Sequence, residues 1–121
     1  DAAALLMKEN DQKFLAGVTS ASPAKDVKRL MTILARGDDK APDPRTAEAA
    51  CQAAQRMCRD DAGFLALIMA GGGPAVLNLG GFLASEGSKK SNAGSREAFA
   101  AARAAADGAV DAVRARALAK L

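Results

Sequence analysis

Residues 44–85 read PRTAEAACQAAQRMCRDDAGFLALIMAGGGPAVLNLGGFLAS and carry the pattern that decides the fold. The segment begins with small residues at helical spacing, continues through the acidic pair Asp60 and Asp61, and then becomes strongly apolar. Three glycines at 71–73 interrupt the apolar run, and Pro74 follows them directly. Aspartate caps helices, glycine ends them and proline suits their first turn, so this order predicts three consecutive helices.

A similar series of residues occurs fifty positions earlier in the chain. A long fixed period is typical of stacked units that bury their apolar faces against one another. The pattern therefore favours a surface that holds another molecule over a pocket for chemistry. The matched positions are Ala3, Ala4, Met7, Asp11, Phe14, Leu15 and Ala16, against Ala53, Ala54, Met57, Asp61, Phe64, Leu65 and Ala66.

The composition of the 121-residue chain favours one all-α domain over residues 1–121. Thirty-one residues are alanine, the best helix former, whereas four are phenylalanine and none is tryptophan or tyrosine. Because alanine buries little area, we expect a thin core between closely spaced helices.

In the first part of the chain, capping residues mark the expected helices. Residues 2–8 are predicted to form a helix tail, and Asn10 or Asp11 is predicted to cap a short helix that follows. A serine before Pro23 indicates the start of an amphipathic helix that runs to about residue 36.

In the last part of the chain, Ser95 is the expected cap of the final helical segment, and Gly108 is an expected break within it. The domain is thereby divided into three units of similar organisation. These approximate units are 1–37, 45–86 and 95–121, separated by loops at 37–44 and 86–95.

The middle unit resembles an armadillo repeat, and its neighbours resemble shorter versions of it. The resemblance implies a short right-handed α-solenoid, non-enzymatic, that binds partner proteins along a concave groove. The residues that carry it are Ala49, Ala50, Cys51, Ala53, Ala54, Asp60, Asp61, the run 64–68, Ala70, Gly71, Gly72, the run 74–77, Leu79 and Leu83.

Four residues are the candidate partner-binding positions that this resemblance implies. Many members of the family hold the partner's backbone with an asparagine near the end of the third helix of a repeat. The matching position here is Arg56 and, by the shorter spacing of the next unit, Arg103; Arg59 and Gln52 complete the set. In place of the asparagine, arginine can donate two hydrogen bonds to one carboxylate. The alternative is that these arginines are simply solvated charges on an exposed helix face.

Little in the sequence points to catalysis. The chain has no histidine, the residue best suited to proton transfer near neutral pH, and no nucleophile stands beside an evident base. The glycines at 71–73 lack the Lys-Ser/Thr of a phosphate loop, and the acids at 38–43 lack calcium-loop spacing. We therefore expect no enzyme activity, no cofactor and no metal.

The net charge and the cysteines limit the kinds of binding partner and the cellular compartment that the sequence favours. A net charge of +3 without stacking aromatics disfavours nucleic acid. Cys51 and Cys58 stand two turns apart on one helix, too far for a mutual disulfide, and are expected to be small buried residues. Free cysteines suit an intracellular location, either cytoplasmic or organellar.

A second hypothesis starts from the uncharged run 62–85, which is long enough for a membrane span but is broken by its glycines. In this hypothesis the chain is an accessory structural subunit of a larger organellar or membrane-associated complex. The run 62–85 would then dock against other subunits or lipid. Membrane contact is possible but not favoured. The orientation of five apolar side chains distinguishes the two hypotheses. If they face the chain's own helices, they support the solenoid, and if they face outward, they support the subunit. These side chains are Phe64, Leu67, Val76, Leu79 and Phe82.

The number of units generates a prediction about stability. At most two complete cycles are visible, whereas solenoids generally need three or more repeats to be stable. We therefore expect the isolated chain to depend on a neighbour, either a longer array or an assembly. A cooperative thermal melt of a monomer at micromolar concentration would contradict this expectation.

Overall fold

A computed structural model describes residues 2–35 and 43–121 of the chain. Within these ranges the protein has six helices and no strand, which confirms the all-α class. The helices are α1 (Ala2–Ala16), α2 (Ala24–Leu34), α3 (Pro44–Met57), α4 (Asp61–Met69), α5 (Gly72–Ser88) and α6 (Ala93–Ala119).

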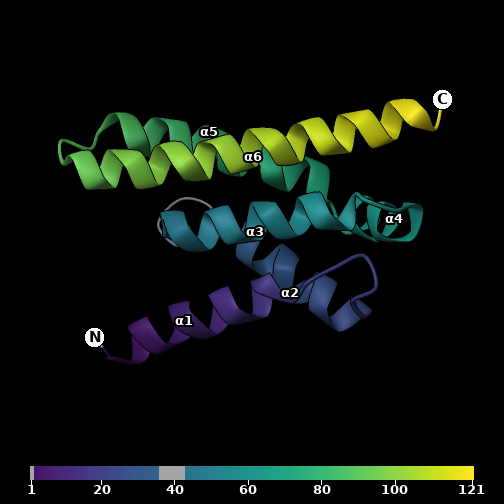
Figure 1. Cartoon of the computed structure of the whole chain (residues 1–121), viewed down its shortest axis with the longest axis horizontal. Coiled ribbons are helices and arrows are strands. Elements are labelled where there is room, and N and C mark those ends of the chain that lie inside the picture. Colours follow the sequence, from purple (N-terminus) through teal and green to yellow (C-terminus); the bar gives the residue numbers. More distant parts are fainter. Residues whose placement is uncertain (1, 36–42) are drawn as a thin grey trace.

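The helices lie in three layers, with α1 and α2 in the first, α3 and α4 in the second, and α5 and α6 in the third (Figure 1). Helix α3 is central, since it contacts α1 and α2 on one side and α6 on the other. Helices α1, α3 and α6 run in the same direction along the molecule (Figure 1).

Small side chains form the middle of the core. Alanines of α3 and α6 are fully buried where these two helices meet, which lets the helices approach closely. Larger side chains fill the space around them. The fully buried large side chains include Leu15, Leu30, Ile33, Met57, Leu67 and Leu83.

The predicted starts of α3 and α4 are confirmed. Asp43 precedes α3 with extended backbone and Pro44 occupies the first turn. The Asp60 carboxylate accepts a hydrogen bond from the Gly63 N–H at 2.9 Å and so caps α4. Gly71 then adopts a left-handed conformation, with φ of 88°, and turns the chain from α4 into α5. Most of the predicted loop 37–44 lies outside the described residues.

The predicted cap at Asn10 or Asp11 is wrong, because α1 runs unbroken through both residues. The Asp11 side chain is buried and pairs with Arg29 of α2 at 3.3 Å. The fifty-residue similarity is therefore one of residue types more than of structure. Leu15 is fully buried, whereas its counterpart Leu65 is 50% exposed.

The expected boundaries of the last two helices also need correction. Helix α5 begins at Gly72 and continues past the expected end to Ser88. Asn92, in place of Ser95, caps α6, because its side chain accepts a hydrogen bond from the Ser95 N–H at 3.1 Å. The expected loop 86–95 is thus a short connection between two helices.

Helix α6 does not break at Gly108. A Cβ atom at this position would lie 2.8 Å from Nε2 of Gln55, which donates a hydrogen bond to the Ala105 carbonyl at 2.9 Å. The glycine therefore leaves room for a polar side chain of α3 to reach the backbone of α6. This contact between helices outweighs the weak helix propensity of glycine.

The apolar run 62–85 is divided between the interior and the surface. Phe64, Leu67, Val76 and Leu79 are buried, and Phe82 packs partly buried against the core. No single helix of the described residues is long and apolar enough to cross a membrane. Helices α4 and α5 reach that length and apolar character only together, and they are bent by 71° relative to each other.

Two glycine-to-alanine substitutions test the packing at the start of α4. At Gly63 a Cβ atom would lie 2.3 Å from the Met57 carbonyl oxygen and 2.6 Å from the Ser20 Cβ, so backbone must move. We expect Gly63→Ala to lower the free energy of unfolding by about 1–3 kcal/mol. Gly81→Ala on α5 meets no atom within 4 Å and should raise it by about 0.5–1 kcal/mol. Urea unfolding followed by circular dichroism measures both values, and equal stability of the two variants would contradict the packing.

Candidate functional site

The Arg56 side chain joins two layers of the structure. Its Nε donates to the Val18 carbonyl at 2.9 Å, and its Nη2 donates to the Leu15 carbonyl. These carbonyls lie at and just after the end of α1, where the helix offers no further N–H donor; the Leu15 carbonyl also accepts a hydrogen bond from the Val18 N–H at 3.2 Å. Arg56 is half-buried and holds the end of α1 against α3, so it is not a solvated surface charge.

Arg116 makes the same kind of contact one layer further on. Its Nε donates to the Cys58 carbonyl at 2.9 Å, and its Nη2 donates to the Arg59 carbonyl, at the end of α3. The same guanidinium pairs with Asp61 at 3.2 Å, and Lys120 pairs with that carboxylate at 2.6 Å. The counterpart of Arg56 in the third layer is therefore Arg116, which the sequence pattern did not single out because it matched Arg103.

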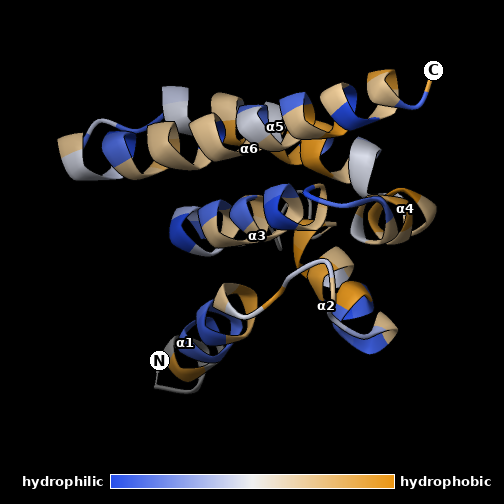
Figure 2. Ribbon diagram, turned by 45° about the vertical axis from the view of Figure 1, so that its right-hand side comes forward, coloured by the Kyte–Doolittle hydropathy of each residue, from blue (hydrophilic) through white to orange (hydrophobic). Residues whose placement is uncertain are grey.

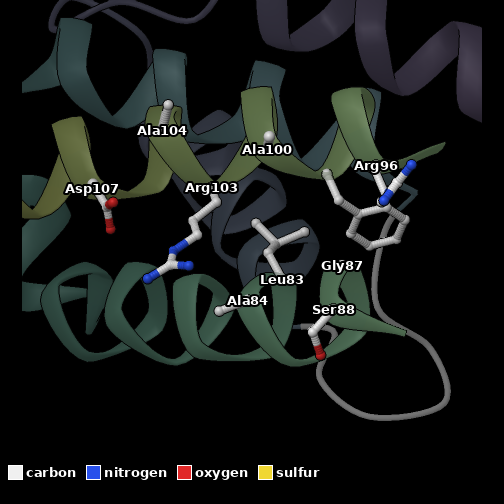
Figure 3. A pocket seen from close by; sticks show the side chains of 10 residues that line it. Leu83, Ala84, Gly87, Ser88, Arg96, Ala100, Arg103, Ala104 and Asp107 are labelled. Carbon is white, nitrogen blue, oxygen red and sulfur yellow. The ribbon is translucent and has the colours of Figure 1, made fainter. Parts of the chain in front are cut away.

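The four candidate partner-binding residues do not form one site. Gln52, Arg56 and Arg59 follow one another along α3 and its end, and Gln52 and Arg59 are exposed. Arg103 is exposed on α6 and lies in a groove that α6 forms with α5 (Figure 3). None of the three α3 residues lines this groove.

The groove between α5 and α6 has a volume of about 410 Å³. Its floor is apolar, with Leu83 buried and Phe99 half-buried. Charged groups stand along its α6 side, where Figure 3 shows Arg103 reaching from α6 toward α5. The lining residues are Leu83, Ala84, Gly87, Ser88, Arg96, Phe99, Ala100, Arg103, Ala104 and Asp107.

A second feature is a set of large apolar side chains that are exposed to solvent around the α4–α5 turn. Leu65, Ile68 and Met69 are 50%, 38% and 86% exposed, and their spacing places them on one face of α4. Leu77 of α5 is 58% exposed and stands one turn after Gly73, whose Cβ position lies 3.8 Å from Ile68. We call these four residues the α4–α5 apolar surface; α4 is coloured mainly in the hydrophobic range in Figure 2.

The titratable groups near the core serve its packing. The hydrogen bond from Gly63 and another from Ser20 lower the pKa of Asp60, which keeps the cap of α4 ionised. Burial raises the pKa of the Cys51 thiol to about 12, and Cys58 is also buried with a raised pKa. Both cysteines are free and buried, which confirms their expected packing role. Within 2–35 and 43–121, no group of three or more His, Cys, Asp or Glu residues is placed to hold a metal ion.

Comparison with protein-family models, with curated proteins and with solved structures found no match to this chain. The geometry of the described residues is therefore what supports a function.

The contact of Arg56 with the end of α1 predicts a difference between two neighbouring arginines. Arg56→Ala should lower the free energy of unfolding by about 1.5–3 kcal/mol, because two carbonyls lose a charged donor. Arg59→Ala removes an exposed side chain whose backbone contact remains, so a change within about 0.5 kcal/mol is expected. Chemical denaturation of both variants measures the difference; a stability loss in Arg59→Ala as large as in Arg56→Ala would argue against the contact.

Proposed function

We propose that this chain is a non-catalytic protein-interaction scaffold, built as a short right-handed α-solenoid of armadillo-like helical units. Two features of the helices support a repeated architecture. Helices α1, α3 and α6 run in one direction in successive layers (Figure 1). At each junction an arginine of the later helix binds the carbonyls at the end of the earlier one.

The observation that carries the proposal is the α4–α5 apolar surface. Single exposed leucines are common in soluble proteins, but several large apolar side chains gathered around one turn indicate a contact surface. Covering Leu65, Met69 and Leu77 by a partner would remove apolar area from water at about 25 cal/mol per Å². The surface therefore suits a partner protein with an apolar face of its own.

The second hypothesis, an accessory structural subunit of a larger complex, uses this same surface. In it the run 62–85 docks against other subunits or against lipid. Burial of Leu67, Val76 and Leu79 in the chain's own core supports the solenoid over this second hypothesis, because the run presents only part of its apolar side chains outward. A lipid-embedded helix pair would present them on its outer side instead.

The absence of catalysis in this proposal is supported by residue chemistry. The chain has no histidine. Its two thiols are buried with raised pKa values, so they are held in the protonated form that does not act as a nucleophile. The arginines that are held in place, Arg56 and Arg116, bind backbone carbonyls.

Charged substitutions on α4 test the scaffold proposal. We expect Leu65→Glu and Met69→Glu to reduce capture of partner proteins from cell extract at least about tenfold, since a buried unpaired carboxylate opposes docking. Both side chains are at least half exposed, so the melting temperature of each variant should be the same as that of the wild-type chain. The control is Leu6→Glu on α1, whose exposed fraction of 57% lies between those of Leu65 and Met69.

Two outcomes decide whether the α4–α5 apolar surface binds proteins, binds lipid or binds neither. Equal capture by Met69→Glu and Leu6→Glu would contradict the proposed surface. Flotation of the wild-type chain with liposomes, lost in Met69→Glu, would favour the lipid-bound form over protein docking.

A further inference from the structure

The groove between α5 and α6 has a charge pattern of its own, and it adjoins the α4–α5 apolar surface where Asp107 lies beside Leu77. Arg96 and Arg103 stand seven residues apart on α6, so they lie about 10.5 Å apart along the helix axis. Asp107 follows Arg103 by one turn. Along this face of α6, the groove edge therefore carries two positive charges followed by one negative charge.

These charges are available to a partner. Neither arginine forms an ion pair with a carboxylate of the described residues, and neither does Asp107 with a base. At the Arg96 end, Lys90 lies 5.2 Å from the centre of the Phe99 ring and adds a further positive charge. The unpaired cations thus outnumber the carboxylates at the groove.

The shape of the groove suits an elongated occupant. Ala100, between the two arginines, and Ala104, directly after Arg103, are exposed and present no side chain beyond a methyl group. A small molecule would remain open to solvent above these alanines, whereas a helix laid along the groove would cover them. Apolar floors flanked by charges are the usual setting for an amphipathic helix in a groove.

We propose that the α5–α6 groove binds an amphipathic helix of a partner protein that carries two carboxylates two turns apart. The two carboxylates pair with Arg96 and Arg103, whose guanidinium groups can each donate two hydrogen bonds to one carboxylate. A basic residue one turn further along the partner faces Asp107, which fixes the direction and register of docking. This inference rests on the proposed role in protein binding but uses a different surface.

The test is fluorescence anisotropy with the full chain and labelled alanine-rich helical peptides. The matched peptide carries two glutamates seven positions apart, leucines between them on the same face, and a lysine four positions after the second glutamate. The control peptide has the same composition, with its two glutamates on opposite faces. We expect the matched peptide to bind at least about tenfold more tightly, and more weakly as salt is added.

Variants of the chain link this preference to the groove. Arg96→Glu and Arg103→Glu together should abolish binding of the matched peptide and create binding of a second peptide that has lysines in place of the two glutamates. This peptide keeps its original lysine, because Asp107 is unchanged in the variant. Ala100→Trp, with both arginines retained, should block the matched peptide sterically without changing any charge. Arg45→Glu, an exposed arginine at the start of α3, should leave binding unchanged. Circular dichroism verifies that each variant is folded.

Three results would overturn the inference. These are equal binding of the matched and control peptides, unchanged binding by the doubly reversed variant, and binding of a fluorescent oligothymidine or of anionic vesicles that outcompetes the matched peptide. The scaffold proposal is tested separately, because Met69→Glu lies outside the groove and should leave peptide binding intact. Loss of peptide binding in the groove variants with unchanged capture by the α4–α5 apolar surface would show two independent contacts.

Discussion

Helix α3 can contact α1, α2 and α6 at once because its buried side chains are small. Four alanines of α3 are fully buried, namely Ala47, Ala50, Ala53 and Ala54. Ala102 and Ala106 of α6 are fully buried as well. Larger residues at these positions would separate the layers and open the core. The high alanine content therefore determines the spacing of the layers as well as their helical conformation.

Close packing of small residues provides little apolar area for each residue, so the layers need additional contacts. The arginines at the helix ends supply them, because their long side chains reach carbonyls that the preceding helix cannot satisfy. Gln55 adds a bond of the same kind in the middle of α6. Each of these bonds joins a side chain of one layer to the backbone of another and thereby fixes how the helices slide along one another.

Features that depend on neighbouring residues could be predicted from the sequence. The start at Pro44, the cap at Asp60 and the turn at Gly71 are all made within a few residues of the chain, and the structure has them where they were expected. Features that depend on distant partners could not. Asp11 resembles a cap in sequence but pairs with α2, and Gly108 resembles a break but accommodates Gln55. The candidate site shows the same difference. Arg103 is exposed on α6, and its partner-binding role stays a prediction, whereas the role of Arg116 depends on the position of α3 and could not be predicted from the sequence.

The arginine bonds have a direction, and this direction limits the symmetry of any assembly built from them. In these bonds the end of α1 supplies acceptors, α6 supplies a donor, and α3 supplies both. A contact of the same kind between two copies of the chain would join unlike surfaces, the donor side of one to the acceptor side of the other. Such a heterologous contact repeats from copy to copy and produces a ring or a filament, whereas a two-fold dimer would have to use a different, self-complementary surface.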